Sequence, residues 1–241
     1  MSQSKMKFRL LATLLLATMI AGCGGGGSGG SSSKSKTFTY SVSLTNLTNA
    51  QPMSPVVVVI HRSGYSAFEI GTAASVELEK LAEGGDGSAL KTAASADNHV
   101  IAVKTLSTGV NPGETKSLSF SVASSERQDL HVTLLSMLTD TNDGFTGVDG
   151  LELKNLGPGG NLFNLAPAYD AGTEKNTESA ATVPGPAAGG TGFSAARNDV
   201  RDIVTLHPGV VSADDGLSTS ALSEAYRFDN PVLQISVTRT Q

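Results

Sequence analysis

The chain has 241 residues, of which 39% are hydrophobic and 16% charged, and its formal net charge at pH 7 is −5. This acidic balance argues against binding to nucleic acid or to anionic lipid through a basic face, because both partners require clustered Lys and Arg. The single cysteine excludes a disulfide within the chain, so stability must come from the hydrophobic core and from any bound metal.

Residues 1–22 have the pattern of a secretory signal peptide. Lys5, Lys7 and Arg9 form a basic head before an apolar core from Leu10 to Ile20. The eleven residues of this core are too few to span a bilayer about 30 Å thick as a helix. We therefore predict that the segment directs export and is then removed, which takes the formal net charge from −5 to −8.

Cys23 ends the sequence Ile20-Ala21-Gly22-Cys23, which resembles a bacterial lipobox. In that motif the cysteine becomes the lipidated first residue of the mature chain. The sole cysteine of the chain stands at the required place, which favours lipidation over plain secretion. The resemblance implies a lipid-anchored protein of the cell envelope. Gly24, in place of the aspartate that retains some lipoproteins on the inner membrane, favours the outer membrane or the cell surface.

Residues 23–36 comprise the cysteine and a linker of Gly, Ser and Lys. This composition buries too little apolar surface to order itself, so we predict a tether between the lipid and a folded domain. Gly26 to Gly30 also matches the Gly-x-Ser-x-Gly motif of hydrolases. That motif requires a strand before it and a helix after it, and the linker has the composition of neither.

A single domain is predicted from Thr37 to Gln241, and its pattern is that of strands. Phe38, Tyr40, Val42 and Leu44 alternate with polar residues, which is typical of a half-buried strand. The continuous β-branched run of residues 56–60 indicates a strand buried on both faces. Further strands are predicted at residues 100–106, 116–122, 130–138, 148–153, 199–206 and 232–238. Strands separated by Gly, Pro, Asn and Asp predict an all-β fold, an antiparallel two-sheet β-sandwich.

One or two short helices interrupt the strands. Residues 73–82 are rich in helix formers, follow a capping candidate at Thr72 and end at Gly84-Gly85. Val76, Leu78 and Leu81 fall near one side of this helix. A second helical turn is predicted at residues 88–94. We expect both to cover an open end of the sandwich and to carry no chemistry.

Three carboxylates stand in two loops of the predicted sandwich. Asp170-Ala171-Gly172-Thr173-Glu174 places two of them around a glycine turn, and Asp143 comes in an earlier loop before Gly144. If the loops meet, these side chains form an oxygen cage suited to Ca²⁺. Without an ion the charges would repel, and one carboxylate would protonate or turn into water. The alternative is an acidic turn that lies in solvent.

Three blocks of the chain, in the right order, resemble the spondin domain of bacterial spondin-domain proteins and of the animal F-spondin family. The first is Ser54-Pro55-Val56-Val57-Val58-Val59-Ile60-His61 with Leu78 to Asp86, the second runs from Leu134 into Asn142-Asp143, and the third runs from Asp170 through Asn176 and Glu178 to Pro186. Together they cover most of residues 54–186.

The resemblance implies a C2-type sandwich with a calcium ion at one end, held by carboxylates of two loops. On this chain the ligands fall on Asp143, Asp170 and Glu174. The animal domains carry tryptophans at the positions of Tyr169 and Gly144, and they also have disulfides that this chain lacks. Glu174 stands where the animal pattern has an aspartate, which leaves mono- or bidentate binding open.

Other metal sites and catalytic sites find less support in the sequence. An EF-hand loop starting at Asp140 would place Phe145 where glycine is required and Leu151 where glutamate is required. The four histidines, at positions 61, 99, 131 and 207, have no zinc-ligand spacing. A Ser-His-Asp hydrolase lacks a recognisable nucleophile turn and oxyanion hole. A glycosidase using the three carboxylates would need aromatic sugar platforms, and aromatic residues make up only 5% of the chain.

The sequence therefore predicts a lipid-anchored, extracytoplasmic adhesion or recognition module rather than an enzyme. Its calcium ion would be structural, and its partner would be a protein or a glycan. Two alternatives remain open at this point. One is an envelope hydrolase that uses Asp143, Asp170 and Glu174 in catalysis. The other is a structural envelope lipoprotein with no soluble partner.

Overall fold

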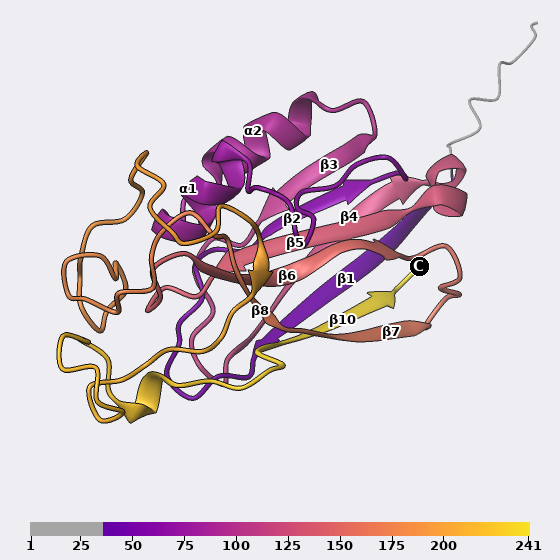
Figure 1. The fold of residues 1–241 in the computed structure, drawn as a ribbon. Helices are drawn as coiled ribbons and strands as arrows, with labels where there is room; N and C mark the ends of the chain where they lie inside the picture. The colour runs from indigo at the N-terminus through magenta and orange to yellow at the C-terminus, as the bar shows by residue number, and fades with distance from the viewer. Residues whose placement is uncertain (1–35) are drawn as a thin grey trace, which may run out of the picture. The chain divides into compact units, whose positions relative to one another are not determined.

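The computed structural model describes residues 36–241, which belong to one compact unit from Ser35 to Gln241. The expected signal peptide, the lipidation site Cys23 and the tether up to residue 35 lie outside the described residues. Two antiparallel sheets, one of four strands and one of six, pack face to face (Figure 1). The predicted all-β sandwich with a few short helices is confirmed. Within residues 36–241, no helix has the length and apolar character needed to cross a membrane.

The four-stranded sheet has the order β4-β1-β10-β7. Its strands are β4 (Thr115–Ala123), β1 (Thr37–Asn46), β10 (Leu233–Arg239) and β7 (Asn161–Ala166). The alternation in the sequence of β1 sets the register, because Val42 lies opposite Leu118 on one side and Val237 on the other. Its apolar residues face the core, and its Ser and Thr residues face outward.

The six-stranded sheet has the order β3-β2-β5-β6-β8-β9. Its strands are β3 (Val100–Thr105), β2 (Val57–His61), β5 (His131–Met137), β6 (Gly144–Glu152), β8 (Ala168–Asp170) and β9 (Thr205–Leu206). All five residues of β2 are buried, as its β-branched run predicts. Val58 and Ile60 face the core between the sheets, whereas Val57 and Val59 face the helices on the other side.

Helices α1 (Val76–Gly84) and α2 (Ser88–Ala96) lie over the outer face of the six-stranded sheet (Figure 1). The expectation that they close an end of the sandwich was wrong, because they form a second core with this face. Leu78, Leu81 and Leu90 pack there against β2 and β5. The helix α1 begins after Ser75 rather than Thr72, since the hydroxyl of Ser75 accepts a hydrogen bond from the N–H of Leu78 at 3.2 Å. Val76 is 52% exposed and lies outside this core.

The remaining chain differs from the prediction in three places. β6 begins four residues before the expected strand, β7 and β8 were not predicted, and the expected strand at residues 199–206 is reduced to the two residues of β9. Two short 3₁₀ helices, Ser124–Asp129 and Glu224–Tyr226, complete the structure. The long loops between β8 and β10 gather at one end of the sheets (Figure 1), where Val183, Val210 and Leu222 form a small separate core.

Candidate metal-binding site in the loops

The pairing of β6 with β8 brings the two acidic loops together. Gly144, the first residue of β6, lies opposite Asp170, the last residue of β8. Asp143 precedes β6 directly, and Glu174 lies four residues beyond the end of β8. The backbone continues the pairing past the strands, because the N–H of Ala171 donates to the carbonyl of Asp143 at 3.2 Å. The sequence therefore correctly placed the two loops side by side.

The carboxylate of Asp143 holds the second loop through one of its two oxygens. Its Oδ2 accepts hydrogen bonds from the N–H of Thr173 at 2.7 Å, from the N–H of Glu174 at 3.0 Å and from the Thr173 hydroxyl at 3.2 Å. The residue is 0% exposed, and its Oδ1 has no hydrogen-bond partner among residues 36–241. A buried acceptor without a partner costs free energy unless a cation, a proton or a water satisfies it.

Asp170 and Asn142 complete the connection between the loops. Asp170 accepts from the N–H of Gly172 at 2.8 Å and from the side-chain amide of Asn176 at 2.6 Å. Asn142, on the first loop, accepts from the N–H groups of Thr177 and Glu178, each at 3.1 Å. Gly172 has a φ of +71°, and a Cβ there would overlap the backbone oxygen of Ile203, so glycine is required at this turn.

Glu174 is influenced both by Asn142 of the first loop and by Glu83 of helix α1. Its Oε2 is buried and has no hydrogen-bond partner in the described part of the chain, and the charge that most affects it is that of Glu83. Glu83 is 1% exposed and accepts a hydrogen bond from the N–H of Ser194 at 2.8 Å, while its second oxygen is also unpartnered. Helix α1 thus supplies a fourth acidic residue to this end of the sheet, which neither motif spacing nor periodicity in the sequence could indicate.

Burial raises the pKa values of these carboxyl groups toward neutral pH. Desolvation, with the nearby charge of Asp170 adding to it, raises the pKa of Asp143 to about 7. Desolvation and the charge of Glu83 raise the pKa of Glu174 to about 7, and desolvation also raises the pKa of Asp170. Carboxylates so perturbed are costly to keep ionised without a cation, which is the electrostatic pattern of a ligand site as well as of an acid-base site.

Glu178 was noted in the sequence only as part of a motif, and the structure gives it a specific place. It is 2% exposed and, at φ +53°, it is the one non-glycine residue with positive φ among the described residues. Desolvation raises its pKa to about 7, with a further contribution from Asp170, and its Oε2 has no hydrogen-bond partner within the described residues. Strained backbone of this kind persists where the surroundings fix it, often at functional sites.

The three predicted ligands share one end of the molecule without forming a finished metal cage. Among residues 36–241, no three His, Cys, Asp or Glu side chains are grouped as the ligands of a metal ion would be. The oxygens without partners on Asp143 and Glu174 nevertheless have the chemistry that calcium prefers. The described chain therefore brings the two acidic loops side by side at one end of the six-stranded sheet.

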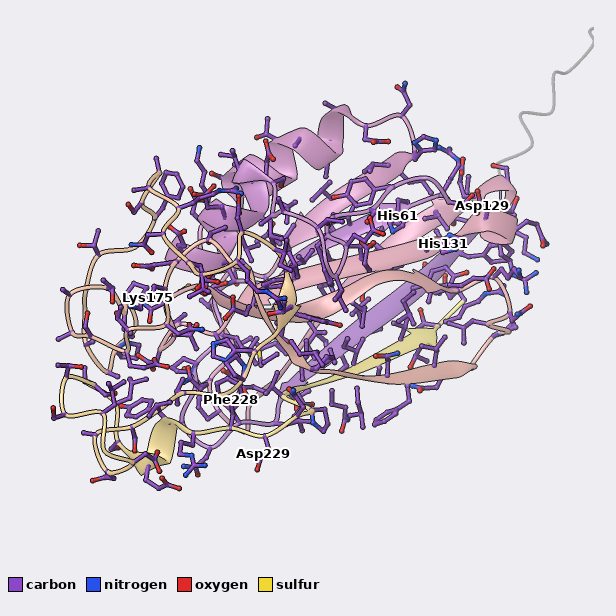
Figure 2. All side chains as sticks on the ribbon, in the orientation of Figure 1. His61, Asp129, His131, Lys175, Phe228 and Asp229 are labelled. Atoms are coloured by element: carbon purple, nitrogen blue, oxygen red, sulfur yellow. The ribbon has the colours of Figure 1, made fainter. Side chains whose placement is uncertain are left out.

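The histidines and the cavities lie in other surroundings. His61 and His131 stack at 5.7 Å at the end of the molecule away from Lys175, the residue after Glu174 (Figure 2). Both ring nitrogens of His61 are in hydrogen-bond contact, one with the carbonyl of Arg62 at 2.7 Å and the other with the Thr133 hydroxyl at 2.9 Å.

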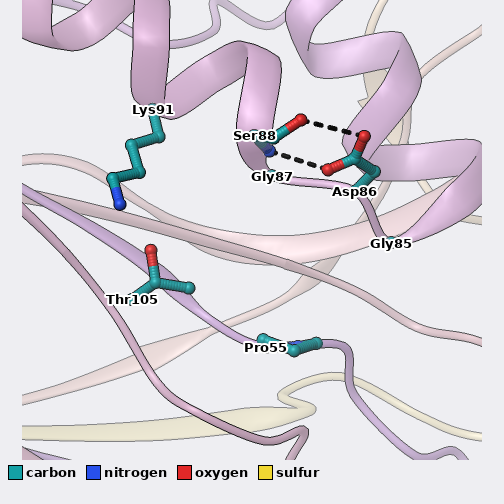
Figure 3. A pocket seen from close by; sticks show the side chains of 7 residues that line it. All are labelled: Pro55, Gly85, Asp86, Gly87, Ser88, Lys91 and Thr105. Atoms are coloured by element: carbon teal, nitrogen blue, oxygen red, sulfur yellow. Dashed lines mark hydrogen bonds between the residues drawn. The ribbon is translucent and has the colours of Figure 1, made fainter.

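A cavity of about 310 Å³ adjoins the start of α2 (Figure 3). There the carboxylate of Asp86 accepts hydrogen bonds from the N–H of Ser88 at 2.9 Å and from its hydroxyl at 3.0 Å.

Comparison with known families decides the assignment of the chain. The family model described as Spondin_N matches residues 38–187, which is more than half of the chain. The chain belongs to the spondin N-terminal domain family. This spondin domain is thereby an extracellular type of module, and the match includes Asp143, Asp170 and Glu174. No curated protein matches the chain.

The structural domain extends beyond the family match. The match ends at residue 187, yet β10 (Leu233–Arg239) lies in the middle of the four-stranded sheet, between β1 and β7. Val237 and Ile235 belong to the core between the sheets. A spondin domain cut at residue 187 would lose a central strand, so the folding unit of this chain reaches its last strand.

Proposed function

We propose that this spondin domain is a calcium-stabilised adhesion or recognition module, held at the outside of the cell envelope by a lipid on Cys23. The observation that carries the metal assignment is the pair of buried, unpartnered oxygens at the loop junction, Asp143 Oδ1 and Glu174 Oε2. Asp143, Asp170 and Glu174 would hold the ion. When bound, Ca²⁺ would supply the positive charge that these acidic groups lack.

The role of the metal in this proposal is structural. The Oδ2 atom of Asp143 already fixes the backbone of Thr173 and Glu174, so charge neutralisation at Oδ1 would stabilise the same junction without new protein contacts. A preordered pair of loops loses less conformational entropy when it binds a partner. The loops between β8 and β10 form the end of the molecule that would meet a protein or glycan ligand.

Burial argues against a catalytic use of the same groups. Asp143, Asp170 and Glu174 are 0%, 5% and 8% exposed, which leaves a substrate no direct access to their oxygens. Three cavities of about 250 to 310 Å³ in the described chain are lined by other residues. We expect no turnover of ester, peptide or glycoside substrates above buffer. Turnover that is lost in Asp143→Asn with the fold retained would instead support the hydrolase alternative.

Calorimetric titration tests the metal assignment. Calcium should bind one site per chain, and magnesium should bind more weakly, because flexible loops provide six to eight oxygens at uneven distances more easily than a tight octahedron. Asp143→Asn should abolish the calcium signal, whereas Asp229→Asn, an exposed residue in another loop, should leave it unchanged. If the titration of calcium into the protein and the titration of chelator-treated buffer give equal heats, the proposed calcium site is refuted.

Cell fractionation tests the anchor. The sequence around Cys23 predicts that the wild-type chain enters the membrane fraction and that Cys23→Ser moves it to the soluble fraction. If Cys23→Ser stays with membranes after a high-salt wash, lipidation is not the anchor.

A pull-down with the mature domain, with and without chelator, would then identify the partner.

A further inference from the structure

Strand β7 forms an edge of the four-stranded sheet, and within residues 36–241 no strand lies beyond it (Figure 1). Its sequence, Asn161-Leu162-Phe163-Asn164-Leu165-Ala166, contains neither a charged residue nor a proline. Phe163 is 58% exposed and Leu165 is 46% exposed, and both lie on the outward face of the sheet. An exposed apolar edge strand offers a template for pairing with another strand.

The other sheet edges of the described chain are protected in ways that β7 is not. The edge strand β4 carries Lys116, and the edge strand β3 carries Lys104. The fourth edge, β9, has only two residues. Lysine and short length are the usual means by which proteins prevent edge-to-edge association. The contrast within one molecule marks β7 as an edge that is left available.

The backbone of β7 shows which groups are free to pair. The N–H of Arg239 donates to the carbonyl of Gly160 at 3.0 Å. Together with the register of β7 on β10, this bond shows which residues of β7 hydrogen-bond to β10. Because hydrogen bonding alternates along an antiparallel strand, Leu162 and Asn164 point their backbone groups at β10, and Asn161, Phe163 and Leu165 point theirs away. Residues 36–241 contain no other segment that bonds to these three backbones.

We propose that β7 pairs with β7 of a second copy of this chain, antiparallel about a twofold axis at Phe163. In this register each residue with free backbone groups meets another such residue, because Phe163 lies opposite Phe163 and Asn161 lies opposite Leu165. The outward side chains also meet outward side chains, as directly opposed residues must. The two sheets would become one continuous sheet of eight strands.

Charge favours a second copy as the occupant of this edge. The outward residues of the four-stranded sheet are Ser, Thr, Asn, Gln, Ala, Phe and Leu, so the face that flanks the proposed joint has no charge. Two copies of this acidic chain can therefore approach here without local repulsion. Opposed aromatic residues add to the stability of a strand pair. One short strand pair buries little area, so the dimer should be weak and dependent on concentration.

Sedimentation of residues 35–241, which contain all the described core, tests the dimer. The wild type should pass from monomer to dimer between about 10 and 500 μM, the range of a weak interface. Phe163→Lys places two like charges opposite each other and should weaken the dimer about tenfold or more. Ser119→Lys adds the same charge to the same face at the opposite edge strand, and it should leave association unchanged.

Amide hydrogen exchange provides the second measurement. Residues 161, 163 and 165 should become protected as concentration rises, while β4 should not. The dimer should form equally in calcium and in chelator, since its contacts lie on a sheet edge rather than in the loops, and its failure is thus separable from failure of the calcium site. A folded wild type that stays monomeric throughout, or a dimer that Ser119→Lys disrupts and Phe163→Lys does not, would overturn the proposal.

Discussion

At the scale of single residues, the two oxygens of Asp143 have opposite environments. Oδ2 accepts three hydrogen bonds from the second loop, and Oδ1 is buried without a partner. Desolvation and the charge of Asp170 raise the pKa of Asp143 to about 7 in the folded chain. The folded state therefore binds a proton that the unfolded chain has released between about pH 4 and pH 7. In the absence of metal, the stabilisation present below pH 4 is lost as the pH rises through 7.

Asp143→Asn should separate the free-energy cost of the buried charge from the role of the side chain in holding the second loop. The amide oxygen can replace Oδ2 as the acceptor for Thr173 and Glu174, and the amide nitrogen replaces the unpartnered oxygen. In chelator at pH 8, the variant should be more stable than wild type, by on the order of 2 kcal/mol. In calcium the order should reverse. Urea unfolding at pH 5 and pH 8, in chelator and in calcium, measures the stability of the wild type and of the variant. A variant that is less stable than wild type in chelator at pH 8 would contradict this account.

At the scale of secondary structure, alternation and β-branched runs indicated most of the strands of both sheets. β7 was missed because its outward positions carry Phe163 and Leu165, so its pattern is not that of a strand with one polar face. β6 was predicted too short because Gly147, which packs directly against the backbone of Leu134, hides the strand pattern. Residues 199–204 resemble a strand in composition, yet Val200 is 87% exposed and the segment is loop.

The start of α1 offers a test of the local reasoning. The hydroxyl of Ser75 accepts from the N–H of Leu78, while the hydroxyl of Thr72 donates to the carbonyl of Glu69. Ser75→Ala should therefore lower the free energy of unfolding by about 1 kcal/mol through loss of the N-cap. Thr72→Ala should change it by less than about 0.5 kcal/mol, as for an exposed surface site. Equal effects of the two substitutions in chemical denaturation would show that the cap is misassigned.

At the scale of the whole molecule, the sheets and the loops differ in how they are stabilised. The sheets share a large apolar core, whereas the loops between β8 and β10 rely on a small core and on buried polar groups. The sequence could indicate Asp143, Asp170 and Glu174 because motif spacing keeps them within two loops. It could not indicate Glu83, which reaches the same region from a helix on the outer face of the sheet. Proximity of that kind depends on packing, and no local pattern encodes it.

Thermal unfolding in calcium and in chelator tests the central claim most directly. If the dissociation constant is about 10 μM, then 1 mM calcium adds roughly 2.7 kcal/mol of stability by mass action. For a domain of this size the melting midpoint should rise by about 5 to 10 °C. Asp143→Asn should lose most of this shift, and Asp229→Asn should keep it. Identical melting curves for the wild type in calcium and in chelator would contradict the claim that a calcium ion joins the two loops.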